Sequence, residues 1–485
     1  MMNWDNLFFN HFQQPERQFL SAQPAATLSD ARLLAWSSPC AAMLGVQQTS
    51  ADWLGIMAGQ HTPAGVAPCA TVYSGHQFGV WAGQLGDGRA LLLGGIETPS
   101  GNVELQLKGS GRTPYSRGAD GKAVLRSSIR EFLCSEAMAG LGIPTTRALA
   151  LAASPQAVYR ESAETAAVVL RAAPSFIRFG HFEHFAARGD AASVQRLADF
   201  VCEHYYPAAA AHAAGTEARY LALLAGVCER TARTVAGWQS MGFCHGVMNT
   251  DNMSILGLTI DYGPFGFLDT FDPQHICNHT DEQGRYSYMN QPSVAHWNLA
   301  CLAQALSTIV PNHDALKATL DTFVSTFEAA HTALFCNKLG IESTHPKAEQ
   351  LINGTLQCLY DAKADMTLFF RRLSHASDDF SDVRDVCINT SAFDEWLPMY
   401  QNMVGKESLA SPQRRTTMLA ANPKYVLRNH LAELAIRETR DTGSTTELLN
   451  LLKVLENPFE EQPEFERYAA LPPAWASQLE VSCSS

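Results

Sequence analysis

The stretch that decides the fold is His245-Gly-Val-Met-Asn-Thr-Asp-Asn252, followed after a short apolar segment by Asp261-Tyr-Gly263. Residues 253–261 read MSILGLTID, and this pattern around a central glycine predicts a β-hairpin. Asn252 and Asp261 are expected at the two ends of the hairpin, where both offer oxygen atoms. Oxygen ligands suit Mg²⁺ and Mn²⁺. The alternative is that these polar residues only form turns.

Features upstream of this stretch favour the functional interpretation. Residues 83–89 (GQLGDGR) lie between two predicted strands, and their glycines let backbone N–H groups approach a phosphate closely. Lys108 ends a predicted strand over residues 103–108 (VELQLK). A helix predicted over residues 123–141 carries Glu131 and Glu136, and either carboxylate can orient the lysine through an ion pair. Of the two, Glu131 is favoured.

The order of predicted elements indicates an α+β, protein-kinase-like bilobal fold, with a small β-rich N-lobe and a large helical C-lobe. Three consecutive antiparallel strands are predicted over residues 77–83, 89–95 and 103–108, and helices dominate from about residue 190. The kinase catalytic loop reads H-R-D-x-x-x-x-N, and the stretch 245–252 keeps its His and Asn. Val247 occupies the position of the usual Asp, which leaves Asp251 as the nearest carboxylate base.

The fold prediction divides the chain into four regions. Residues 1–70 are expected to form an N-terminal extension of loop and short helix. Residues 71–175 form the N-lobe with the glycine loop, the strand lysine and the helix glutamate. Residues 176–340 form the C-lobe with the catalytic hairpin, and residues 341–485 form a helical C-terminal region with a cysteine tail.

Composition narrows the class of protein. The 485 residues are 46% hydrophobic and 17% charged, which is typical of a globular chain, and the formal net charge is −13. Such a charge argues against a protein that coats nucleic acid. No apolar run approaches the roughly 18 residues of a membrane span, and the N-terminus does not read as a secretory signal. The 12 cysteines are scattered without a CxxC motif, which indicates free thiols in the cytoplasm.

Together these motifs resemble the selenoprotein O family, kinase-like protein adenylyltransferases whose bacterial members carry Cys where eukaryotic relatives carry selenocysteine. The resemblance covers most of the chain. The matching strings are YSGHQFG (73–79), LKGSG (107–111), TPYSR (113–117), RSSIREF (126–132), GIPTTR (142–147), GVMNTDNMS (246–254), DYGPFGF (261–267), NPKYVLRN (422–429) and the tail CSS (483–485).

The resemblance implies a bilobal kinase-like fold that binds ATP in a flipped orientation and transfers AMP to Ser, Thr or Tyr hydroxyls of target proteins. The implied cofactors are ATP with Mg²⁺ or Mn²⁺, and UMP transfer with Mn²⁺ stays open. The implied partners are protein substrates, with no nucleic acid and no membrane; the oligomeric state is left open. Two alternatives remain. One is an ordinary phosphotransferase. The other is an inactive nucleotide-binding scaffold, which is favoured by Val247 at the position of the usual Asp.

The resemblance also assigns residues to roles. Asp251 is the implied proton acceptor, and Asn252 and Asp261 are the implied metal ligands. The sequence segment 118–122 (GADGK) departs from the Gly-Asp-Gly-Arg that the family commonly shows, although its Asp and second Gly are kept. The implied nucleotide contacts are Gly86, Gly88, Arg89, Lys108, Asp120, Gly121, Arg171, Arg178 and Asp261.

A redox hypothesis concerns the tail. Cys483 is the third residue from the end, where a cysteine is rarely part of a core. Cys277 follows Asp261 in the region expected for an activation loop. A disulfide between Cys277 and Cys483 would tie the tail to that loop and modulate access to the site.

Overall fold

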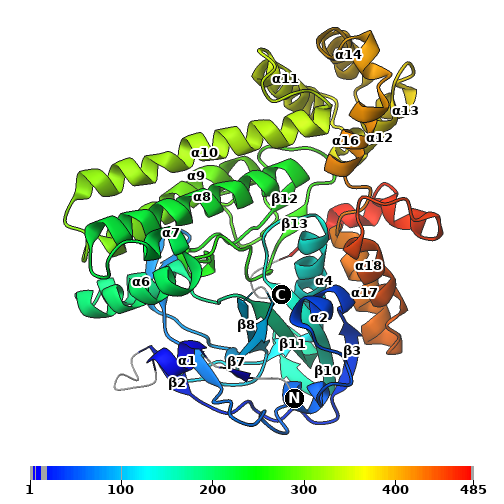
Figure 1. Ribbon diagram of the computed structural model, residues 1–485. Coiled ribbons are helices and arrows are strands. Elements are labelled where there is room, and N and C mark those ends of the chain that lie inside the picture. Colours follow the sequence, from blue (N-terminus) through cyan, green and yellow to red (C-terminus); the bar gives the residue numbers. More distant parts are fainter. Residues whose placement is uncertain (1–3, 6, 13–18, 100, 482–485) are drawn as a thin grey trace.

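The structure is a computed structural model that describes residues 4–5, 7–12, 19–99 and 101–481. A small, mainly β-sheet region and a large helical region make up the molecule (Figure 1). The two regions give a mixed α/β architecture, with helices from the end of the chain returning to the sheet.

The main sheet has nine antiparallel strands. Its order is β2-β4-β7-β8-β11-β10-β3, with β1 beside β7 and β9 beside β11. The central pair β7–β8 places Lys108 opposite Ala90 and, on its other side, opposite Val169 of β11. The strands are β1 (Trp4–Asp5), β2 (Leu20–Ala22), β3 (Arg32–Trp36), β4 (Cys69–Thr71), β7 (Ala90–Thr98), β8 (Gly101–Lys108), β9 (Ala123–Val124), β10 (Arg147–Tyr159) and β11 (Ala163–Ala173).

Helices cover both faces of this sheet. Helix α4 (Leu125–Gly140) packs on one face through fully buried residues such as Ile129, Phe132 and Leu133. The other face is covered by α2 (Ser38–Leu44) and α3 (Trp53–Met57). Because both faces are buried, the central strands read as apolar runs rather than as an alternating pattern.

The expectation that residues 77–83 form the first strand of a meander is wrong. Strands β5 (Ser74–Gln77) and β6 (Val80–Gln84) instead form a separate two-stranded hairpin. Phe78 and Gly79 both adopt positive φ, 51° and 80°, and reverse the chain inside the predicted strand. Because the β5–β6 hairpin is not part of the main sheet, it can contact the helical region.

Residues 1–70 are also more than loop and short helix. Strands β2 and β3 from this segment, together with β4, belong to the main sheet, where β3 pairs with β10 and β2 pairs with β4. Strands of three to five residues are too short to show a clear period in the sequence. The sheet therefore draws its outer strands from the segment expected to lie apart from the N-lobe.

Residues 253–261 do not form the predicted hairpin. The two sides of the segment pair with other parts of the chain, Ser254 with Arg178 and Thr259 with Thr145. The turn between them is closed by Gly257 N, which donates to Ser254 O at 3.0 Å. The nearby short strands are β12 (Phe243–Cys244) and β13 (Gly266–Phe267), which pair with each other.

The helical region carries most of the remaining chain. Helices α17 and α18 lie beside α4 of the sheet region, whereas α11–α16 share a core of their own (Figure 1). The helices are α1 (Leu7–Phe12), α5 (Phe179–Ala186), α6 (Ala191–Tyr205), α7 (Pro207–Ala210), α8 (Glu217–Met241), α9 (Gln291–Leu306), α10 (His313–Leu339), α11 (Ala348–Asp361), α12 (Met366–His375), α13 (Ser381–Arg384), α14 (Thr390–Val404), α15 (Lys406–Leu409), α16 (Pro412–Ala421), α17 (Asn429–Thr442) and α18 (Thr446–Glu456), with 3₁₀ turns at Thr250–Asn252, Tyr288–Asn290, Pro463–Ala469 and Ala474–Gln478.

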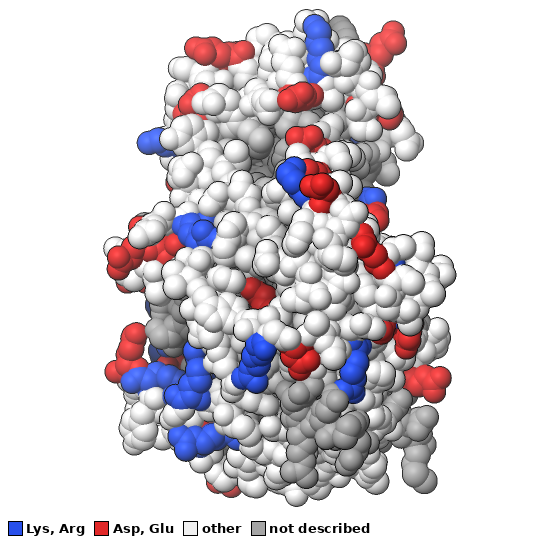
Figure 2. Space-filling view, turned by 90° about the vertical axis from the view of Figure 1, so that its left-hand side faces the viewer, with Lys and Arg blue, Asp and Glu red and all other residues white. Residues whose placement is uncertain are grey.

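Two further features concern membrane-spanning character and surface charge. Among the residues described here, no helix has both the length and the apolar character needed to cross a membrane. Charged side chains of both signs occur on the face drawn in Figure 2, with basic side chains gathered in the lower half of the view.

Candidate active site

A cleft of about 610 Å³ opens where β8, β11 and the glycine loop face the segment 247–264. This volume lies within the range of about 300–1,000 Å³ that small-ligand sites occupy. All of the residues assigned above to the nucleotide, the metal and the proton line this one cleft: Gly86, Gly88, Arg89, Lys108, Asp120, Gly121, Arg171, Arg178, Asp251, Asn252 and Asp261.

Asp261 is the centre of a dense cluster of charges in the cleft. Its Oδ1 lies 3.1 Å from Lys108 Nζ and 2.6 Å from Arg171 Nη1, and its Oδ2 accepts a hydrogen bond from Arg178. Asp261 itself adopts a positive φ of 63°, which is uncommon for a residue with a side chain. Such a conformation is kept where the surroundings hold it, and functional sites are where it is usually found.

Glu131 of α4 completes this cluster. Lys108 Nζ lies 2.7 Å from Glu131 Oε2, and Arg171 Nη1 lies 3.1 Å from Glu131 Oε1. Glu136, the other candidate, pairs instead with Arg147 and accepts a hydrogen bond from Ala148 N at 3.0 Å. We refer below to Lys108, Glu131, Arg171, Arg178 and Asp261 as the Asp261 cluster.

The charges of the cluster shift the pKa values of its members. Burial by itself raises the pKa of Asp261, but Arg178, Lys108 and Arg171 overcome this effect and hold it well below its usual value. Burial lowers the pKa of Lys108, and the carboxylates of Asp261 and Glu131 oppose that shift. Three cations facing two carboxylates leave positive charge in excess beside an open cleft, which suits a ligand with several negative charges.

Asp251 stands next to the cluster in a different environment. Burial raises its pKa to about 6, against the attraction of Arg178. Its Oδ2 accepts a hydrogen bond from Gln77 Nε2 at 3.2 Å, and Oδ1 is buried with no partner in another described residue. A carboxylate with a pKa close to neutrality and an unshared oxygen has the properties of a general base.

Asn252 and Asp261 provide the oxygen atoms on which a metal site depends. Asn252 Nδ2 donates to Val247 O at 3.0 Å, which leaves its carbonyl oxygen for another partner. A carbonyl oxygen and an ionised carboxylate are ligands that a hard cation such as Mg²⁺ or Mn²⁺ takes, so the residues present fit such an ion. Val247 occupies the position of the Asp in the motif H-R-D-x-x-x-x-N, and its aliphatic side chain offers no acid–base group.

Two glycines that line the cleft are packed too closely for a side chain, namely Gly86 of the glycine loop and Gly121 of the segment 118–122. A Cβ on Gly86 would lie 2.6 Å from the Tyr115 ring and 2.9 Å from Thr71 O, and Gly86 adopts a φ of 126°. A Cβ on Gly121 would lie 2.1 Å from Gly111 O. At both positions bare backbone faces the cleft, as close approach to a phosphate requires.

Asp120 has a partner that the sequence did not indicate. Both of its carboxylate oxygens accept hydrogen bonds from Arg160 at 2.9 Å, and this pairing lowers its pKa. Arg160 also lines the cleft. It lies in the turn between β10 and β11, where no sequence motif marks it.

Further cleft residues were missed by reasoning from single motifs. Tyr73 lies under Arg178, with the guanidinium carbon 5.0 Å from the ring centroid, and Gln77 holds Asp251. Buried Asp87 accepts hydrogen bonds from Thr71 N and Oγ1 at 2.9 and 2.6 Å. Tyr73 and Gln77 belong to the string YSGHQFG, so the signal was present, but nothing local showed that it reaches the segment 245–252.

Only one cysteine of the predicted redox pair lies within the described residues. Cys277 is buried and donates a hydrogen bond to Cys244 O at 3.3 Å, whereas Cys483 lies outside the described residues. The last described residue, Val481, accepts a hydrogen bond from His279 N at 2.9 Å. The described part of the tail therefore ends beside the loop that carries Cys277.

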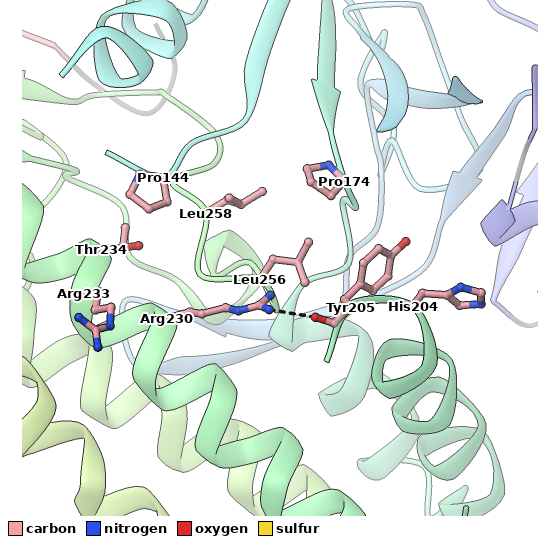
Figure 3. A pocket seen from close by; sticks show the side chains of 9 residues that line it. All are labelled: Pro144, Pro174, His204, Tyr205, Arg230, Arg233, Thr234, Leu256 and Leu258. Atoms are coloured by element: carbon pink, nitrogen blue, oxygen red, sulfur yellow. Dashed lines mark hydrogen bonds between the residues drawn. The ribbon is translucent and has the colours of Figure 1, made fainter. Parts of the chain in front are cut away.

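A separate cavity of about 390 Å³ lies among Pro144, Pro174, Leu256 and other residues (Figure 3). Its walls are largely apolar, and Arg230 on one side donates to Tyr205 O at 2.9 Å. The predicted nucleotide, metal and base residues are not among the residues that line it. The charged cleft, rather than this cavity, is the candidate active site.

Comparison with known proteins shows the family of the chain. A family model described as protein adenylyltransferase SelO matches residues 4–456. The chain therefore belongs to the SelO family, which confirms the resemblance drawn from the motifs, and it is a nucleotidyltransferase.

Curated relatives match over nearly their whole length. The protein nucleotidyltransferase YdiU of Cupriavidus pinatubonensis is 52% identical over 495 residues, covering 97% of this chain and 93% of its own. The protein of the same name from Burkholderia thailandensis is 50% identical over 498 residues, covering 98% and 95%. That of Dechloromonas aromatica is 49% identical over 492 residues, covering 99% and 98%.

Proposed function

We propose that the protein transfers AMP from ATP to hydroxyl side chains of other proteins. One observation carries the proposal, namely the convergence of three cations on Asp261 beside the separately placed Asp251 in a single cleft. The cations suit a triphosphate, and Asp251 suits an acceptor hydroxyl. Family membership supports the transfer of a nucleotidyl group rather than a terminal phosphate.

The same arrangement supports a protein-kinase-like bilobal fold. A strand lysine paired with a glutamate of the following helix, and an aspartate after the catalytic segment, occur here as Lys108, Glu131 and Asp261. The division into an N-lobe over 71–175, a C-lobe over 176–340 and a C-terminal region over 341–485 belongs to this proposal. So does a cytoplasmic location, for which the free thiols of the described cysteines are the supporting feature.

The chemical step follows from the residues in the cleft. Asp251 takes the proton of the acceptor hydroxyl, whose oxygen bonds to the α-phosphorus of ATP, and pyrophosphate leaves. Lys108, Arg171 and Arg178 stabilise the charge that builds up on the phosphate oxygens. A Mg²⁺ or Mn²⁺ ion held by Asn252 and Asp261 supplies further positive charge to the phosphates when bound.

The glycine loop and the cations have separate tasks in this scheme. Gly86, Gly88 and Gly121 let backbone reach the nucleotide, and Arg89 adds a cation at the end of the loop. Asp120, held by Arg160, limits the movement of the segment 118–122. Positioning of this kind accounts for much of the catalysis in phosphate transfer, where the protein does little covalent chemistry.

Intact-mass measurement tests the proposal. After incubation with ATP, metal and a protein acceptor, including the chain itself, the added mass is expected to equal one AMP moiety. Asp261→Asn is expected to abolish the addition. Asp272→Asn serves as the matched control, because it changes a carboxylate outside the cleft that accepts a hydrogen bond from Gln274 N. An added phosphate mass would support the phosphotransferase instead, and UTP with Mn²⁺ in a parallel reaction tests UMP transfer.

We also keep the Cys277–Cys483 disulfide as a proposal. The approach of Val481 to His279 supports it, because it places the end of the described tail close to the Cys277 loop. Non-reducing peptide mapping of oxidised protein is expected to yield a linked peptide. Free thiols at both positions under oxidising conditions would contradict it.

A further inference from the structure

A third cavity, of about 600 Å³, lies beside the β5–β6 hairpin and is lined by residues of the hairpin, α5 and α9. Three side chains with metal-binding atoms meet in it. One atom each of His76, Glu183 and Cys301 lie within 4.8 Å of one another. The three residues come from β5, α5 and α9, which are far apart in the sequence.

The donors are held in place before any ion binds. His76 Nδ1 lies 2.6 Å from Glu183 Oε1, and the Glu183 side chain is only 4% exposed. The imidazole of His76 contacts the rings of Trp81 and Trp297 edge-on, at centroid distances of 5.1 and 5.4 Å. Both tryptophans line the same cavity. Rigid first ligands of this kind reduce the entropy that binding would cost.

We propose that His76, Glu183 and Cys301 bind a divalent ion of the zinc class, with a fourth position open to the cavity. Imidazole nitrogen, carboxylate oxygen and thiolate sulfur are the ligands that Zn²⁺ takes, and three protein ligands with one open position are a common arrangement. Mg²⁺ and Ca²⁺ prefer all-oxygen sites, which this one is not. The site stands whether or not the transferase proposal holds.

Charge and distance both allow the ion. A thiolate and a carboxylate balance the two positive charges of Zn²⁺, so the half-buried site becomes neutral when it is filled. Zn–N and Zn–O bonds of about 2.0–2.1 Å in a tetrahedron put neighbouring ligand atoms about 3.3 Å apart. His76 and Glu183, at 2.6 Å, therefore need to separate by less than about 1 Å.

In the neutral imidazole of His76, the one ring proton lies on Nδ1 and is donated to Glu183 Oε1. When the ion binds Nδ1, this proton moves through solvent to Nε2, which leaves Nδ1 and the carboxylate as ligands. The Cys301 thiol loses its proton to solvent as the Zn–S bond forms. Burial and Glu183 raise the pKa of this thiol to about 12 in the metal-free chain, so the ion itself has to drive the deprotonation.

The proposed site is connected to the active site through the β5–β6 hairpin. His76 N donates to Thr250 Oγ1 at 2.7 Å, and the next residue, Gln77, holds the carboxylate of Asp251. An ion at His76 would brace the hairpin against α5 and α9. It would thereby fix the position from which Gln77 orients Asp251.

Co²⁺ is the probe that tests the proposal, because cobalt bound to a thiolate shows a charge-transfer absorption band that cobalt bound only to oxygen lacks. The full chain is stripped of metal and titrated with Co²⁺ in excess Mg²⁺, which fills oxygen-rich sites. We expect one equivalent to produce the band and Zn²⁺ to remove it. Cys301→Ser should lose the band, whereas Cys358→Ser, which changes a buried cysteine outside the cavity, should keep it.

A second variant separates loss of a ligand from loss of the fold. Glu183→Gln keeps the size of the side chain and should weaken Co²⁺ binding at least tenfold, while the circular dichroism in chelator stays that of the parent. No band in the parent chain, or a band of full intensity in Cys301→Ser, would overturn the proposal. Unchanged Co²⁺ affinity in a folded Glu183→Gln variant would remove Glu183 from the ligand set and overturn it as stated.

Discussion

Two clusters of buried ion pairs have different roles in this molecule, one in ligand binding and one in joining elements of the fold. In the Asp261 cluster, three cations face two carboxylates beside an open cleft. In the second, the Arg428 cluster, one arginine lies between two carboxylates. Arg428 lies 2.9 Å from Asp365 Oδ2 and also pairs with Asp269.

The Arg428 cluster joins elements. Asp365 caps α12 by accepting a hydrogen bond from Leu368 N at 2.9 Å, Asp269 follows β13, and Arg428 precedes α17. Burial acts to lower the pKa of Arg428, but Asp365 and Asp269 raise it above its usual value. The Arg428 cluster has one cation for two carboxylates and does not line the cleft, whereas the Asp261 cluster has an excess of positive charge beside the cleft. Buried charge alone therefore does not mark a binding site. The mark of a binding site here is an excess of positive charge at the wall of a cavity.

The largest effect is expected from Asp261→Asn. The variant removes the carboxylate that gathers three cations and offers a metal ligand, so transfer of AMP should fall by about 10³-fold or more. A labelled-ATP assay measures the loss, and circular dichroism checks the fold. A folded variant that retains a tenth of the parent activity would contradict the binding role of the Asp261 cluster.

Arg428→Met should act on stability. Removal of one partner from a buried ion pair leaves unpaired charge, and we expect the free energy of unfolding to fall by about 3–5 kcal/mol. Urea denaturation of the purified chain measures the change. The control is Arg233→Met, which removes an exposed pair with Glu229 and should cost about 0.5 kcal/mol or less. Equal losses in the two variants would contradict a bridging role for Arg428.

A milder test within the Asp261 cluster is Arg178→Lys. Arg178 uses one planar group to reach both Asp261 and the backbone oxygen of Asp251, the latter at 2.7 Å. Lysine keeps the charge but not this geometry, so transfer should fall by about 10²-fold. Arg188→Lys, at a residue that donates to Gln84 outside the cluster, should stay within about twofold of the parent. Parent activity in Arg178→Lys would show that charge alone is needed.

The smallest effect concerns pH. Asp251 acts as a base only when it is ionised, and burial raises its pKa to about 6 from the usual 3.8. Transfer should therefore be constant above about pH 6 and fall about tenfold for each pH unit below it. A rate profile in constant ionic strength measures this limb. A profile that stays flat down to pH 4.5 would remove Asp251 from the role of base.

The sequence predicted local relations better than distant ones. Lys108 at a strand end and Glu131 in the second turn of the next helix were placed on their elements by local patterns, and they meet as expected. The contact between Gln77 and Asp251 joins residues 174 positions apart, and no local pattern encodes it.

The two wrong predictions of local structure also result from contacts between distant parts of the chain. The segment 253–261 has apolar residues on both sides of a central glycine, which predicted a hairpin, but its backbone pairs with Arg178 and Thr145 from elsewhere in the chain. Residues 77–83 read as one strand because their apolar side chains hide the turn at Phe78 and Gly79. Tertiary pairing decided both cases, and a single sequence does not show it.

The proposed function depends on which phosphorus of ATP is attacked in the cleft. The most direct measurement gives the same protein and acceptor either ATP labelled at the α-phosphate or ATP labelled at the γ-phosphate, with Mg²⁺ and then with Mn²⁺. We predict label on the acceptor only from α-labelled ATP, and none with Asp261→Asn. Label from γ-labelled ATP alone would contradict the account and make the enzyme a phosphotransferase.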